Sequence, residues 1–136
     1  MMEIYKIPGK LVGKWNYDVH AMIDTWNDHD VTKEEFEQCL LKGCCHAKQN
    51  DGIAWIVDTS KAKGVFNSEI QIFIGSHIFP TFQKIGVKYF ITIKSRIDPL
   101  TKMTVSNYSA KAGPNGLQLL EVNMVEDGIK WLKENS

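Results

Sequence analysis

The sequence predicts an α/β fold, a single mixed β-sheet covered by helices in the order ββαβαβαβα. Three apolar runs support this prediction, at residues 53–58, 87–94 and 117–124, and each is followed by a loop and a helical segment. Strands covered on both faces form near-continuous apolar runs, and parallel strands are joined through helices. The length of 136 residues suits one domain, so residues 1–136 are expected to form a single unit.

The sheet is expected to open with an antiparallel hairpin. Apolar and polar residues alternate over residues 10–16 and 18–27, which is the period of a strand with one buried face. Asn16 and Asp18 favour a turn between these strands because their side chains can bond to the nearby backbone. Residues 2–7 are expected to add a short edge strand.

Two longer helices are predicted in the middle of the chain. Thr32 and Glu35 form a capping box, so a helix should run from there to about residue 48, with Cys44 on its buried stripe. Residues 68–85 also have helical periodicity, but Pro80 is expected to break that helix because proline lacks the amide hydrogen.

The last third of the chain predicts two further helices. Asp98 followed by Pro99 is typical of a helix start, and residues 125–133 form the closing amphipathic helix. Apolar positions in the strands predict the sheet core, for which we expect Leu11 or Val12, Ile23, Ile56, Phe90 and Leu119.

The composition narrows the classes of partner. Sixteen basic and sixteen acidic residues give a net charge of zero, and no dense basic patch is present, which argues against nucleic acid. No apolar run reaches the ~20 residues of a membrane span, and no secretory signal pattern is seen, so a cytoplasmic protein is expected. The odd number of cysteines, three, fits a reducing compartment. The balanced charge also leaves a homodimer open.

No metal, cofactor or catalytic set is predicted. Cys44, Cys45 and His46 are consecutive on one helix, where successive side chains point about 100° apart, so they cannot converge on one ion. His29, between Asp28 and Asp30, is expected to lie in a solvated loop. An enzyme is the least supported hypothesis because no acid–base pair in a pocket can be named.

Four passages, taken in their order, resemble a known family of domains. They are Trp26 ahead of the capped helix at Thr32, then Trp55-Ile56-Val57-Asp58, then Phe79-Pro80 followed by Gly86-Val87-Lys88, and finally Asp127-Gly128-Ile129-Lys130-Trp131-Leu132. Together they resemble the STAS-like (anti-sigma-factor-antagonist-like) small bacterial domains, which are distantly similar to CRAL-TRIO lipid-binding domains. The resemblance implies a non-enzymatic regulatory or protein-interaction function, with a protein as partner.

In such domains, the resemblance implies, a phosphorylatable serine follows an aspartate at the start of a helix. Ser68 stands at the matching place, but Asn67 precedes it and Glu69 follows where a small residue is usual. The predicted phosphorylation or partner-contact site comprises Ser68, Asn67, Asp58 and Glu69. A structural interpretation stays open as well, in which Asn67 or Ser68 simply caps the helix.

The alternative function is that of a carrier for a small apolar, lipid-like ligand. Open α/β sheets bind ligands in the crevice at their strand ends, next to the helices. The predicted pocket lies beside the helical segment 68–85, and its expected lining residues are Trp26, Phe66, Phe73 and Phe79.

Overall fold

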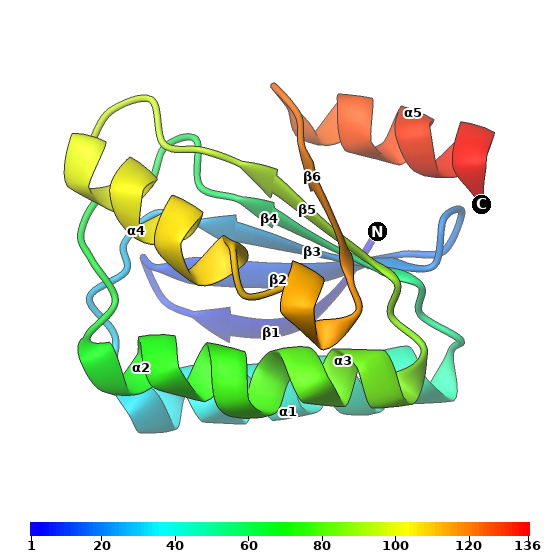
Figure 1. The fold of residues 1–136 in the computed structure, drawn as a ribbon, viewed down its shortest axis with the longest axis horizontal. Helices are drawn as coiled ribbons and strands as arrows, with labels where there is room; N and C mark the ends of the chain where they lie inside the picture. Colours follow the sequence, from blue (N-terminus) through cyan, green and yellow to red (C-terminus); the bar gives the residue numbers. More distant parts are fainter.

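A six-stranded mixed sheet forms the centre of the molecule in the computed structural model, which describes residues 1–136 (Figure 1). Its strands lie in sequence order: β1 (Met2–Ile7), β2 (Leu11–Asn16), β3 (Ala21–Trp26), β4 (Ala54–Asp58), β5 (Tyr89–Ile93) and β6 (Gln118–Glu121). The first three strands pair antiparallel, and β3 to β6 pair parallel. The predicted mixed α/β fold is confirmed, with β1 as the additional edge strand.

Five α-helices connect or follow these strands: α1 (Lys33–Gln49), α2 (Ser68–Phe73), α3 (Phe79–Ile85), α4 (Pro99–Ser109) and α5 (Val125–Asn135). A π-helical turn, Ile74–Ile78, joins α2 to α3, and a short 3-10 turn, Gly113–Asn115, precedes β6. None of the helices combines the length and the apolar character needed to cross a membrane.

Local capping fixes two of the helix starts. The Glu35 amide donates to the Thr32 hydroxyl at 3.1 Å, and the Thr32 amide donates to the Glu35 carboxylate at 2.9 Å, which is the predicted capping box. The Asp98 carboxylate accepts from the Leu100 amide at 3.0 Å and so begins α4 directly before Pro99. Both starts were visible in the sequence because a cap depends on residues within one turn.

The helical segment 68–85 is not broken at Pro80. Figure 1 shows α2, the π-turn and α3 following one axis, drawn in green. The Phe79 amide donates to the Ile74 carbonyl, five residues back, so the turn ahead of Pro80 is wider than an α-turn. Proline has no amide hydrogen and its ring crowds the preceding turn. The wider turn accommodates both effects, and the expected break is corrected to a π-turn.

The two faces of the sheet carry separate apolar clusters. Helices α1 to α4 cover one face with a cluster of 28 buried residues, while α5 covers the other face with a cluster of 8 (Figure 1). The core predictions for Leu11, Ile23, Ile56 and Phe90 are confirmed. The prediction for Leu119 is wrong: it is 43% exposed, because β6 is the edge strand and the helices do not cover its outer part.

Candidate functional site

A small cavity of about 30 Å³ lies between the sheet and the helices of the larger cluster. Twelve of its thirteen lining residues are hydrophobic, and Asp24 is the exception. Eight of the thirteen are aromatic: Trp26, Phe36, Trp55, Phe66, Phe79, Phe82, Phe90 and Tyr108. Every lining residue is buried.

Three of the four predicted pocket residues line this cavity, namely Trp26, Phe66 and Phe79. Phe73 does not line it. Its ring stacks on the exposed His77 ring at 5.1 Å and meets the Phe36 ring edge-on, so it fills the space between α1 and α2. A helical residue six positions before Phe79 lies on a different part of the helix surface, and the π-turn between them shifts the register further.

Asp24 is the polar group that the sequence analysis missed. It lies on β3 and is only 2% exposed. Its carboxylate accepts a hydrogen bond from the Tyr5 hydroxyl, and a second one from the Trp55 indole at 2.9 Å. The sequence held a signal for this burial. Side chains alternate between the two faces of a strand, so Asp24 shares a face of β3 with Met22 and Trp26, which are both apolar.

Strand register brings these groups together. Gly13 on β2 pairs with Tyr5 on one side and with Asp24 on the other, and Asp24 pairs with Val57 on β4. Because Gly13 has no side chain, the Tyr5 ring can lie across β2 and reach Asp24. A Cβ atom at Gly13 would lie 2.2 Å from a ring carbon of Tyr5.

The carboxylate of Asp24 has no cationic partner. Neither of the two ion pairs in the structure involves it. Burial raises the pKa of Asp24 to about 6, although the hydrogen bonds from Tyr5 and Trp55 lower it in part. A carboxyl group with a strongly raised pKa in an apolar cavity costs folding free energy and is a candidate functional group.

Tyr108 of α4 also lines the cavity and is only 3% exposed. Burial raises the pKa of Tyr108, and the negative charge of Asp24 adds to this effect. The phenol therefore stays neutral and is able both to donate and to accept a hydrogen bond.

His29 is a second buried polar side chain, outside the cavity. It is fully buried between the rings of Trp26 and Phe66, whose centroids lie 5.0 and 4.1 Å from its own. The expectation of a solvated loop is thus wrong. Neither ring nitrogen has a hydrogen-bond partner within ordinary geometry. Burial lowers the pKa of His29 to about 4, outweighing the nearby groups that favour its charged form.

The cysteines form no cluster with other ligands. Cys39 and Cys44 are buried on α1, as predicted for Cys44, and Cys45 is exposed. Burial raises the pKa of Cys39 to about 11 and that of Cys44 to about 12, so both are neutral thiols. The structure holds no group of three or more histidine, cysteine or acidic residues placed to bind a metal ion.

The predicted phosphorylation or partner-contact residues lie around the start of α2. Asn67 caps this helix, with its side chain accepting from the Ile70 amide at 2.9 Å. Ser68 is the first helical residue, exposed and without a hydrogen bond to its hydroxyl. Glu69 and Asn67 border a polar groove next to the start of α1, whereas Asp58 bonds to the Ser60 amide within its own turn.

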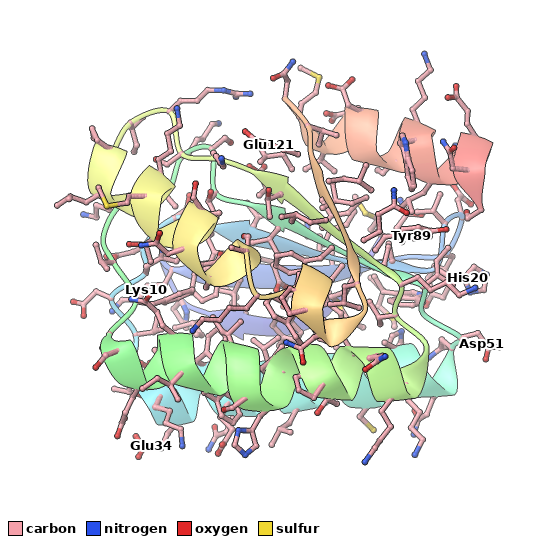
Figure 2. All side chains as sticks on the ribbon, in the orientation of Figure 1. Lys10, His20, Glu34, Asp51, Tyr89 and Glu121 are labelled. Carbon is pink, nitrogen blue, oxygen red and sulfur yellow. The ribbon has the colours of Figure 1, made fainter.

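Figure 2 shows Lys10 and Glu34 at this same end of the molecule, opposite the end that carries His20, Asp51 and Tyr89. The groove beside Asn67 holds both signs of charge, with Lys10 and Lys33 facing Asp30, Glu34, Glu35 and Glu69. It is therefore not a basic pocket built for a phosphate group.

Comparisons with known proteins found no family model, no curated protein and no solved structure that matches this chain. The resemblance to STAS-like and CRAL-TRIO domains thus stays a prediction from the sequence passages.

Proposed function

We propose that this protein binds a small, largely apolar molecule in the aromatic cavity between the sheet and α3. The observation that supports the proposal is the lining of the cavity, in which Asp24 is the one residue that is not hydrophobic. Ligand sites are typically lined by hydrophobic and aromatic side chains with a few polar groups that orient the ligand. This was the alternative function in the sequence analysis, and the geometry favours it over the regulatory one.

The volume of the cavity implies that ligand entry needs a local movement. A cavity of about 30 Å³ has room for a water molecule, whereas an engineered cavity of about 150 Å³ is needed to admit benzene. The π-turn contributes Ile74 and Ile78 to the wall. Single π-turns occur frequently at functional sites. An outward shift of this turn would enlarge the cavity without disturbing the sheet.

Filling the cavity provides the test. Val57→Ile adds one methylene at a wall residue, and we expect it to weaken binding of toluene at least tenfold, on the order of the 1.4 kcal/mol that corresponds to a factor of ten. Binding is measured by the change in fluorescence of the wall residues Trp26 and Trp55 and by the ligand-induced rise in Tm.

The matched control is Val19→Ile, the same change at a buried position in the cluster beneath α5. It should leave toluene binding unchanged. Equal loss of binding in both variants would show a general effect on stability, and absence of any toluene binding to the wild-type protein would contradict the proposed function.

A second candidate function is regulation through Ser68. The observation that favours it is that Asn67, not Ser68, caps the helix, so the Ser68 hydroxyl is exposed and free for modification or contact. The mixed charges beside it favour a protein surface as partner over a phosphate-binding role.

For this second candidate, Ser68→Asp should reduce recovery of a specific partner severalfold in a pull-down from native lysate. The free energy of unfolding should change little, because a negative charge at a helix start contributes only about 0.3–1 kcal/mol. Ser68→Ala serves as control and should retain the partner at nearly unchanged stability, since the hydroxyl makes no hydrogen bond. Equal recovery with all three versions would exclude a switch at Ser68.

A further inference from the structure

The cavity combines a carboxylate without a counter-ion and a wall of aromatic rings. Asp24 is buried with two neutral donors, the Tyr5 hydroxyl and the Trp55 indole, and no basic side chain pairs with it. A buried carboxylate is normally paired with a cation, or it takes up a proton and becomes neutral. The charge that would complete this site is therefore absent from the protein itself.

The Asp24 carboxylate has hydrogen-bonding capacity left for a molecule in the cavity. A carboxylate can accept about four hydrogen bonds, and Tyr5 and Trp55 supply one to each oxygen. The cavity thus offers the remaining acceptor positions of the Asp24 carboxylate to a bound donor.

The aromatic walls favour the same class of ligand. Cations are attracted to the faces of tryptophan, tyrosine and phenylalanine rings, most strongly where water is excluded. Trp26, Trp55 and Phe79 line the cavity and are each at most 2% exposed. Other cavity rings hold this wall in place, with Phe82 stacked on Trp55 at 4.3 Å and Phe90 edge-on to Phe79 at 4.9 Å.

We propose that the cavity selects an organic ammonium ion, with its charged group at Asp24 and its apolar body against the aromatic rings. This inference rests on the proposed function and names the ligand class. The site does not suit a metal ion, because Asp24 is the only acidic lining residue and hard cations need six or more oxygen ligands. A carboxylate at this place repels anions.

Asp24 is the group whose charge changes in the accessible pH range. The titratable groups that face it are Tyr5 from β1, Cys39 and Cys44 from α1, and Tyr108 from α4. Burial raises the pKa of each of these four, so all are neutral near pH 7. Ammonium selectivity should therefore follow ionisation of Asp24, with its pKa near 6.

The experiment compares probes of nearly the same shape: benzylammonium, benzyl alcohol and toluene. Their binding to the full-length protein is measured by isothermal titration and by tryptophan fluorescence. At about pH 8 we expect benzylammonium to bind at least tenfold more tightly than benzyl alcohol, as one charge-assisted hydrogen bond predicts. At about pH 5, below the pKa of Asp24, this preference should be lost while benzylammonium itself stays charged.

Asp24→Asn gives an independent test, since the amide retains hydrogen-bonding atoms without the charge. The variant should bind benzyl alcohol and lose the tenfold preference for benzylammonium. If the wild-type protein binds the neutral probes as tightly as the cation at both pH values, the ammonium inference is wrong and the proposed function survives. If it binds none of the three probes, both proposals fail.

Discussion

Asp24→Asn is expected to gain stability over the wild-type protein as the pH rises from about 4 to 8. The gain between these limits should be about 2 kcal/mol, because one pKa unit corresponds to about 1.36 kcal/mol, the pKa of Asp24 rises from 3.8 to about 6 on folding, and the unfolded carboxyl is already partly ionised at pH 4. Replacing a buried residue also has a cost that does not depend on pH, so the change in the difference with pH is what reports the raised pKa of Asp24.

The sign of this change in stability with pH follows from proton binding. Folded protein holds the Asp24 proton more tightly than unfolded protein, so this proton stabilises the fold below about pH 4. The stabilisation is lost as the pH rises through about 6, where the buried group ionises. An asparagine does not titrate, and the difference in unfolding free energy between the two proteins therefore grows over this range.

Chemical denaturation at a series of pH values measures that difference. His29 also contributes to the pH dependence of stability in each protein. Its pKa is lowered to about 4, so its effect on the free energy of unfolding has the opposite sign to that of Asp24 between about pH 4 and 6.5. Both proteins contain His29, so its contribution cancels in the comparison. Asp18→Asn, at an exposed position, controls for the loss of a charge. A difference that does not vary with pH would contradict the raised pKa of Asp24.

The parts of this structure that the sequence predicted are those governed by local rules. Apolar periodicity located the strands, and the caps at Thr32 and Asp98 located two helix starts, because each signal lies within a few residues. The two faces of the sheet were harder to assign. Leu119 looks like a core residue from its own strand, and only the position of β6 at the edge exposes it.

The site itself depends on contacts between distant segments. Trp26, Phe66 and Phe79 could be predicted because aromatic residues near strand ends and helices tend to be buried. The pairing of Asp24 with Tyr5 and Trp55 joins three strands, and no local pattern encodes it. The π-turn is similar, since Pro80 signalled a disturbance but not that the helix would widen and continue.

Gly13→Ala should destabilise the protein by about 3 kcal/mol or more, the effect of a single added methyl group at the centre of this network. The new Cβ would lie 2.2 Å from a carbon of the Tyr5 ring, a distance at which the ring must move. Overpacking a core costs about 1–3 kcal/mol. Displacing Tyr5 also weakens its hydrogen bond to Asp24, and such bonds to charged groups are worth about 1.5–3 kcal/mol.

Urea denaturation of four proteins separates these two effects: the wild type, Gly13→Ala, Asp24→Asn and the double variant. Because the methyl group acts partly through the carboxylate, Gly13→Ala should cost less stability in the Asp24→Asn protein than in the wild type, with a coupling of about 1 kcal/mol or more. Gly113→Ala is the matched control, since a Cβ there meets no atom within 4 Å, and it should be nearly neutral. Strict additivity would mean that Gly13 only makes room for the Tyr5 ring. Coupling would instead show that a residue without a side chain holds the cavity's one carboxylate in place.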